Sequence, residues 1–316
     1  MFPVLFTLRL GGREIGIHSY GVLIALGLAL GIALAYRQAR RVGLDGGRVL
    51  DAAFWMTLAG LVASRLAYVL VNVRDFARVC ASGSGAPRSF GSVLADCGRV
   101  FAVWQGGLVF LGGVAGAAWV AYRFSRREGW SFAVVGDLFA PALALGHAFG
   151  RAGCYAAGCC FGKASSVAWA VAFPRGSVAF DELTAVGAIA PGADVTPPLH
   201  PTQLYEAAGE LAIGVALIAL RPRLARRPGA LLFVYLAAYA LLRFVVELAR
   251  GDVARGFIVE LDTPRLAALL RLPPAEPVLL SVGQLGSLLV LAALAAVIVV
   301  RRRRRLDHTA PQTPAP

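Results

Sequence analysis

Residues 279–305 read LLSVGQLGSLLVLAALAAVIVVRRRRR, a long apolar run that ends in five consecutive arginines. A helix needs about 20 apolar residues to cross the hydrocarbon core of a bilayer, and this run supplies them. Other stretches have the same character, and the seven predicted spans are residues 17–36, 51–73, 103–122, 132–150, 203–220, 229–249 and 279–300. The sequence therefore predicts an all-α polytopic membrane protein with seven transmembrane helices.

Composition and charge support this fold class. Hydrophobic residues make up 58% of the 316 positions and charged residues only 16%, whereas soluble domains carry about 25% charged residues. The net charge of +13 would indicate nucleic-acid binding in a soluble protein. Here 16 of the 31 basic residues lie in alternate connections and the tail, at 37–48, 123–127, 221–227 and 301–305. By the positive-inside rule these segments and the C-terminus are cytoplasmic and the N-terminus is outside.

We expect a single membrane domain over residues 1–305. Two long connections on the outer side predict an external arm at about 74–102 and a small external head at about 164–202, which contains a β-like run from Val167 to Phe173. Residues 306–316, rich in Pro and Thr, predict a disordered cytoplasmic tail. The first dozen residues lack the features of a signal peptide, so we expect no processing.

Ionisable residues inside the predicted spans mark functional candidates, because each costs about 2.5–3.5 kcal/mol to insert. They are Arg65, His147, Arg151, Glu206, Glu210, Arg243 and Glu247. His147 and Arg151 are four residues apart, as are Arg243 and Glu247, so each pair shares a helix face. The acids look too few to match three arginines, which predicts surplus guanidinium groups that bind a lipid phosphate. For Arg65, a salt bridge that only stabilises the bundle is the alternative.

The five cysteines fall into two groups. Cys80 and Cys97 lie in the predicted arm, where an oxidising environment makes a disulfide plausible. Cys154, Cys159 and Cys160 have the spacing C-x4-C-C, which matches no common zinc pattern. They either pack as small residues or act as thiolates, since a thiol beside Arg151 would have a lowered pKa.

Seven segments in order resemble the bacterial prolipoprotein diacylglyceryl transferase family. They are IHSYGVLIALG (17–27), SRLAYVL (64–70), VWQGGLVFLGG (103–113), GDLFAPALALGHAFGRAGCYAAGCCFG (136–162), HPTQLYEA (200–207), RFVVELARGD (243–252) and SVGQLGS (281–287). The resemblance implies a seven-helix bundle with a periplasmic arm and head in the bacterial inner membrane. It also implies transfer of a diacylglyceryl group from phosphatidylglycerol to the lipobox cysteine in a prolipoprotein signal peptide, with no cofactor, metal or nucleic acid.

By the same resemblance, the expected catalytic residues are Arg151, Arg243, Tyr20 and Glu247. The expected substrate-binding residues are Arg65, Gly162, His200, Gln203, Tyr205, Glu206, His147 and Cys154. Arg151 and Arg243 would hold the phosphate, Tyr20 would make a polar contact near the reacting carbon, and Glu247 would orient Arg243.

The chain departs from the family at three of these motif positions. Leu111 stands where the family has a histidine, Cys154 where it usually has an asparagine, and Cys159 where it commonly has an acid. One reading is a divergent transferase in which His147 or His18 supplies the missing polarity. The alternative is a paralogue that keeps the lipid-binding bundle but performs other lipid or redox chemistry through its cysteines. A transporter or scaffold is a third reading, disfavoured by the lack of an internal repeat.

Overall fold

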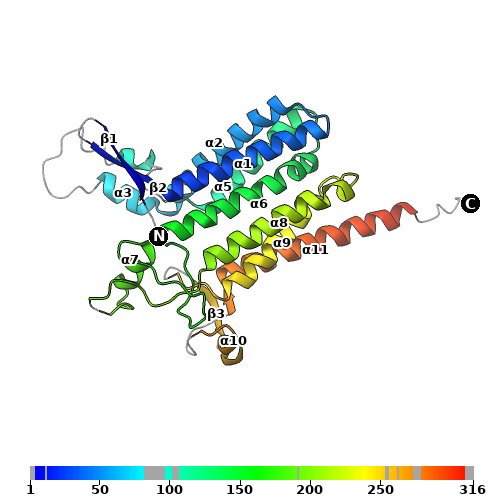
Figure 1. The fold of residues 1–316 in the computed structure, drawn as a ribbon. Coiled ribbons are helices and arrows are strands. Elements are labelled where there is room, and N and C mark those ends of the chain that lie inside the picture. Colours follow the sequence, from blue (N-terminus) through cyan, green and yellow to red (C-terminus); the bar gives the residue numbers. More distant parts are fainter. Residues whose placement is uncertain are drawn as a thin grey trace, which may run out of the picture. The chain divides into compact units, whose positions relative to one another are not determined.

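The structure, a computed structural model, describes residues 4–10, 13–81, 97–101, 107–190, 192–252, 256–261, 263–272 and 279–309. Helices predominate in these ranges (Figure 1). The elements are β1 (Val4–Leu10), β2 (Arg13–His18), α1 (Ser19–Arg41), α2 (Gly46–Val71), α3 (Val73–Ala81), η1 (Arg99–Phe101), α5 (Phe110–Arg127), α6 (Phe132–Ala157), α7 (Val178–Ala185), α8 (Thr202–Leu224), α9 (Ala230–Glu247), β3 (Phe257–Leu261), α10 (Pro264–Leu269), β4 (Leu279–Ser281) and α11 (Val282–Thr309).

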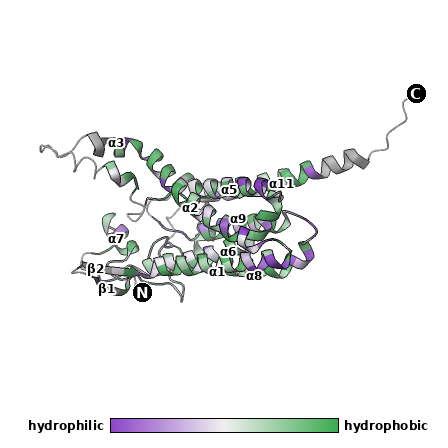
Figure 2. Cartoon of the chain, turned by 90° about the horizontal axis from the view of Figure 1, so that it is seen from above, coloured by the Kyte–Doolittle hydropathy of each residue, from purple (hydrophilic) through white to green (hydrophobic). Residues whose placement is uncertain are grey.

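Six of the described helices, α1, α2, α6, α8, α9 and α11, are long and apolar enough to cross a membrane. Figure 2 shows hydrophobic residues along these helices. The chain is thus mostly helical, as a polytopic membrane protein would be. The predicted span at 103–122 overlaps α5, whose last turns carry Arg123, Arg126 and Arg127. Since residues 102–106 lie outside the described ranges, a seventh span stays a prediction.

The chain divides into two compact units, and the smaller is residues Ala35–Leu138. Within it, glycines let α5 lie close against α2. A β-carbon on Gly112 would lie 2.5 Å from the Ala67 β-carbon, and one on Gly116 would lie 2.6 Å from the Ala59 carbonyl oxygen. Small residues at helix contacts are the expected basis for packing in lipid.

The larger unit comprises Met1–Leu34 and Phe139–Pro316. Helix α9 packs between α8 and α11, and α6 runs alongside α8 (Figure 1). A core of side chains from α6, α8 and α9 joins these helices: Ala140, Ala144, Leu217, Leu231 and Tyr235. This packing fixes the positions from which α6, α8 and α9 present their ionisable residues.

The connections outside the helices differ from prediction in three ways. The strands β1 and β2 form an antiparallel hairpin that the sequence did not predict. The expected β-run Val167 to Phe173 is wrong, because this segment forms only isolated bridges, such as Val171 with Leu199, around a small core. The predicted tail is helical at its start, since α11 continues through Thr309.

The arm is described only in part. Helix α3 opens it, and Cys97 at its far end is disulfide-bonded. The side chain of Cys80, the partner that the sequence suggests, lies outside the described residues.

Candidate active site

Glu206, on α8, stands at the centre of the predicted site. Its carboxylate is 1% exposed and contacts a guanidinium on either side. Arg151 on α6 places Nη2 3.0 Å from Glu206 Oε1. Arg243 on α9 donates from Nη1 to Glu206 Oε2 at 3.3 Å. One buried carboxylate therefore holds both predicted arginines and joins three helices.

His147 and Glu210 extend this network by one helical turn. Arg151 donates from Nε to His147 Nε2 at 3.2 Å. Because a guanidinium has no acceptor, His147 Nε2 accepts and the ring proton sits on Nδ1. That nitrogen lies 2.6 Å from Oε1 of the fully buried Glu210, so it donates to this carboxylate. Both ring nitrogens of His147 are therefore engaged in hydrogen bonds.

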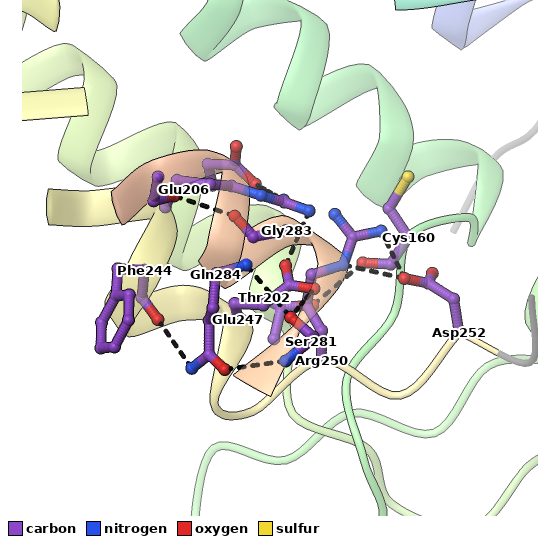
Figure 3. Close-up of polar contacts among 12 residues, drawn as sticks. Cys160, Thr202, Glu206, Phe244, Glu247, Arg250, Asp252, Ser281, Gly283 and Gln284 are labelled. Carbon is purple, nitrogen blue, oxygen red and sulfur yellow. Dashed lines mark hydrogen bonds and ion pairs between the residues drawn. The ribbon is translucent and has the colours of Figure 1, made fainter. Parts of the chain in front are cut away.

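Glu247 fixes the other side of Arg243 and ties it to the start of α11. Its Oε2 lies 2.7 Å from Arg243 Nη2, and its Oε1 accepts from Ser281 Oγ at 3.0 Å. Ser281 is also the N-cap of α11. Its Oγ accepts from Gln284 N at 3.2 Å while Gln284 Oε1 accepts from Ser281 N at 3.1 Å, which is a capping box. Figure 3 shows Glu247 against this helix start.

Gly283 makes the close approach of Glu247 to α11 possible. A β-carbon at this position would lie 2.8 Å from the carboxyl carbon of Glu247. Any larger residue would therefore displace the carboxylate that orients Arg243.

A cavity of about 280 Å³ opens beside these groups. It is lined by Arg243, Glu247, Arg250, Asp252, Gly256, Val282 and Gly283. Arg250 donates from Nε to Asp252 Oδ2 at 2.8 Å, and its Nη2 contacts the same oxygen (Figure 3). Two guanidinium groups, each aligned by a carboxylate, thus face one cavity. Arg–phosphate recognition uses such oriented donors.

The expected surplus of guanidinium groups is wrong for the described residues. Glu206 contacts both Arg151 and Arg243, Glu247 contacts Arg243 again, and Asp252 contacts Arg250. The acids within the spans are sufficient, because Glu206 alone contacts two of the three arginines and the third, Arg65, donates to backbone carbonyls. A phosphate would therefore be bound by guanidinium N–H groups beyond those that the carboxylates engage, since each guanidinium has five donors.

Three thiols lie next to Arg151. The Sγ atoms of Cys154, Cys159 and Cys160 all lie within 4.8 Å of one another, the only described group of His, Cys, Asp and Glu side chains with the spacing of a metal site. Hydrogen bonds among the three thiols lower the pKa of Cys160, with a further contribution from the positive charge of Arg250, and raise the pKa of Cys159. The three side chains are only partly buried, so small molecules can reach them.

Residues of the HPTQLYE segment hydrogen-bond to the backbone that carries the three cysteines. Gln203 donates to the Cys159 carbonyl at 2.8 Å, and its neighbour Thr202 donates to the Cys160 carbonyl at 2.9 Å. Gly162 lies where a β-carbon would be 2.5 Å from the His200 carbonyl oxygen. These residues hold the backbone of the cysteine loop in place, which is a positioning role.

His200 and Tyr205 link the head to α10. His200 Nε2 lies 3.0 Å from the carbonyl oxygen of Leu270 and so donates to it, while Nδ1 accepts from the Tyr205 hydroxyl at 3.0 Å. Trp169 donates to the same hydroxyl at 2.6 Å. Burial lowers the pKa of His200, so the imidazole is neutral in this network.

Tyr20 packs directly on α6. A β-carbon on Gly153 would lie 3.1 Å from Tyr20 Cδ2. Its phenol is close enough to Arg151 and to the three thiols for electrostatic interaction. Tyr20, which the resemblance placed near the reacting carbon, therefore lies beside the arginine and the cysteines. His18, at the end of β2, is exposed.

Arg65 and Leu111 belong to the smaller unit. Arg65 is 7% exposed and donates from Nε to the Val100 carbonyl at 2.9 Å and from Nη1 to the Gly107 carbonyl at 3.1 Å. It fastens these segments to α2, and its predicted substrate contact stays a prediction. Leu111 is 76% exposed in the first turn of α5.

Four residues of the site had no role predicted from the sequence. Glu210 was noted as an ionisable residue in a span, but its pairing with His147 was not predicted. Arg250, Asp252 and Ser281 all lie in the quoted RFVVELARGD and SVGQLGS segments. Arg250 and Asp252 lie just beyond the predicted span 229–249, which was a usable signal, since charged residues at a span end can face a pocket there. Ser281 lies inside the predicted span 279–300 and gave no such signal.

Comparison with known proteins gives one consistent result. A family model described as prolipoprotein diacylglyceryl transferase matches residues 3–300. A relative from Clostridium tetani is 27% identical over 85% of this chain and 93% of its own length. One from Pseudomonas paraeruginosa is 29% identical over 81% and 85%, and one from Thermosynechococcus vestitus is 32% identical over 78% and 81%. All three are named phosphatidylglycerol–prolipoprotein diacylglyceryl transferase.

Proposed function

Because the chain belongs to the prolipoprotein diacylglyceryl transferase family, we propose that it moves the diacylglyceryl group of phosphatidylglycerol onto the lipobox cysteine thiol of a prolipoprotein. The prediction of a membrane transferase in lipoprotein maturation is confirmed by the family and the relatives. We propose the two substrates named above for this chain, and the following roles for its residues.

The observation that carries the proposal is the guanidinium pair held on Glu206. In the proposed reaction a thiolate attacks the glyceryl carbon, the carbon–oxygen bond breaks, and glycerol phosphate leaves with the electron pair. Negative charge grows on the departing phosphate oxygen. Preorganised donors aimed at developing charge in a site with little water are the strongest single source of such catalysis, at about 10²–10³-fold for one donor.

The residues divide by role. Arg243 faces the cavity and binds the phosphate, with Arg250 as a second donor on the same wall. Arg151 lies beyond Glu206 and beside the thiols, where it stabilises the incoming thiolate and the departing oxygen. Glu206 and Glu247 orient the guanidinium groups, and Tyr20 bounds the reacting centre.

We also propose the topology predicted from charge. Seven spans, with α5 as part of the third, place the N-terminus, the arm and the head in the periplasm and the arginine-rich end of α11 in the cytoplasm. The protein then lies in the inner membrane and meets the prolipoprotein signal peptide within the bilayer.

Conditional replacement tests the function. A host depleted of its own transferase and expressing this chain should accumulate lipobox peptides whose mass has grown by a diacylglyceryl group, detected by mass spectrometry. An inactive control such as Arg151→Ala, expressed to the same level in the membrane, separates activity from insertion. Unmodified peptides in cells that contain the inserted wild-type chain would refute the proposed function. That result would favour the alternative of other lipid or thiol chemistry at the cysteine cluster.

A further inference from the structure

We propose that Cys154, Cys159 and Cys160 bind one zinc ion whose fourth position takes the thiol of the incoming prolipoprotein cysteine as a thiolate. This inference rests on the proposed function and adds a metal that neither the resemblance nor the family implied. It assigns the activation of the nucleophile to the cysteine cluster.

The geometry of the cluster fits three ligands of one ion. The sulfur atoms lie within 4.8 Å of one another. Zinc binds thiolates at about 2.3 Å, which places tetrahedral sulfurs roughly 3.8 Å apart. The thiols therefore need to close by about 1 Å at most, within the range of a rotamer adjustment. The described residues offer three such ligands and not four, which is the arrangement of catalytic zinc sites with one open position.

The backbone around the cluster is held in the conformation that brings the thiols together. Cys160 has a φ of +59°, a left-handed value that is uncommon for a residue with a β-carbon. Two side chains that are 1% exposed, Thr202 and Gln203, each donate to a carbonyl of the Cys159–Cys160 pair. Such local strain persists only where the surrounding structure enforces it. Packing of small residues alone does not require it.

The cluster lies among charged side chains of both signs. Three thiolates and one Zn²⁺ carry a net charge of −1, and a fourth thiolate makes it −2. Arg250 and Arg151 are both close enough to Cys160 for electrostatic interaction, and Figure 3 shows Cys160 beside Arg250. The carboxylates of Asp252 and Glu182 also interact electrostatically with Cys160, so the N–H donors of the two guanidinium groups, and not a surplus of positive charge, would stabilise the thiolates.

The chemistry explains why a metal is useful here. A free cysteine thiol has a pKa of about 8.5, so most of it is protonated at neutral pH. His147 does not serve as a free base, because its Nε2 accepts from Arg151 and its Nδ1 donates to Glu210. Zinc lowers the pKa of a bound thiol, and the proton passes to water. The thiolate then forms the carbon–sulfur bond, glycerol phosphate leaves with the carbon–oxygen electron pair, and the zinc keeps its oxidation state.

Metal binding is the first test. The full chain, purified in detergent under reducing conditions and loaded with zinc, should retain one zinc per chain by elemental mass spectrometry. Cys154→Ser, Cys159→Ser and Cys160→Ser should each weaken zinc binding by more than about a hundredfold, because even the outer partners of zinc ligands are worth about 10–100-fold. A Cys80→Ser/Cys97→Ser double variant removes the other two cysteines and should bind zinc like the wild type.

Cobalt substitution is the second test, because tetrahedral Co²⁺ reports its thiolate ligands in the visible and near-ultraviolet spectrum. A lipobox peptide with one cysteine should increase the sulfur-to-cobalt charge-transfer band, and the same peptide with serine should leave it unchanged. A charge-transfer band that changes with neither peptide would overturn the proposal. So would zinc bound equally by a variant that lacks all three cysteines, or a disulfide among them that persists under the reducing conditions.

Neither readout requires lipid transfer. Normal metal and peptide binding without any lipid-modified product would reject the proposed function and keep the site. Lipid transfer by a protein that contains no zinc would reject the proposed zinc site and keep the proposed function.

Discussion

Replacing Glu206 by glutamine tests the role of the shared carboxylate. The glutamine keeps the size of the side chain, but one oxygen becomes an amide nitrogen. In either orientation that nitrogen meets a guanidinium, because Arg151 contacts Oε1 and Arg243 contacts Oε2. One charge-assisted hydrogen bond, worth about 1.5–3 kcal/mol, is lost. Removing one partner from a buried ion pair costs about 3–5 kcal/mol, so we expect a loss of stability in that range.

Glu210→Gln is the matched control for this substitution. Glu210 lies one turn away on the same helix and is equally buried. Its Oε1 contacts His147, while its Oε2 makes no hydrogen bond within the described part of the chain. A glutamine can keep its carbonyl on His147 and place its amide where Oε2 was. The expected cost is therefore only about 1 kcal/mol.

Both variants are compared with the wild type by thermal and denaturant unfolding in the same detergent, followed by transfer kinetics. Glu206→Gln should unfold far earlier and lose about a hundredfold in transfer rate, since a displacement of about 1 Å can cost that much. Glu210→Gln should stay close to the wild type in both. Equal behaviour of the two variants would refute the idea that Glu206 organises the site.

Three further outcomes are expected. Arg243→Lys should lower the transfer rate by about a hundredfold in a kinetic assay, because a point charge does not span two carboxylates and a phosphate as a planar guanidinium does; a rate near wild type would contradict this. Gly283→Ala should reduce the transfer rate by displacing Glu247. Gly286→Ala should keep the wild-type rate, because a β-carbon at Gly286 has no neighbouring atom within 4 Å. Equal transfer rates for the two variants would remove the steric argument. Burial lowers the pKa of His200 in the folded protein, so the unfolded chain takes up a proton at a higher pH than the folded protein does. Unfolding assays should therefore show the free energy of unfolding falling as the pH drops below about 6.5. His200→Gln should remove that contribution, and an unchanged pH slope in this variant would contradict the reasoning.

The fold was predictable where the physical signal is long and one-dimensional. Runs such as 279–300 are too apolar to be anything but buried or in lipid, and α11 includes residues 282–300 of that run. The N-terminal hairpin was missed because its short strands sit directly before an apolar span that dominates the local hydropathy. The β-run at 167–173 was wrong because its residues pair across long sequence distances, as Val171 does with Leu199, and local alternation does not predict such partners.

The site was predictable in its members but not in its connections. The cost of a buried charge identified Arg151, Glu206 and Arg243, and four-residue spacing correctly paired Arg243 with Glu247. That Glu206 links Arg151 to Arg243 depends on how α6, α8 and α9 pack, which periodicity along one chain does not specify. The convergence of the three thiols likewise depends on a backbone conformation set by side chains from another helix.

The most direct measurement follows a single lipobox peptide through the reaction. The purified chain is reconstituted in phosphatidylglycerol bilayers, the peptide is added, and its mass is read over time. We predict a gain of one diacylglyceryl group with the wild type, and none above background with Arg151→Ala or Arg243→Ala when each variant is recovered folded at the same yield. A peptide that gains the group at the wild-type rate with either variant would contradict the claim that Arg243 binds the phosphate and that Arg151 stabilises the departing oxygen.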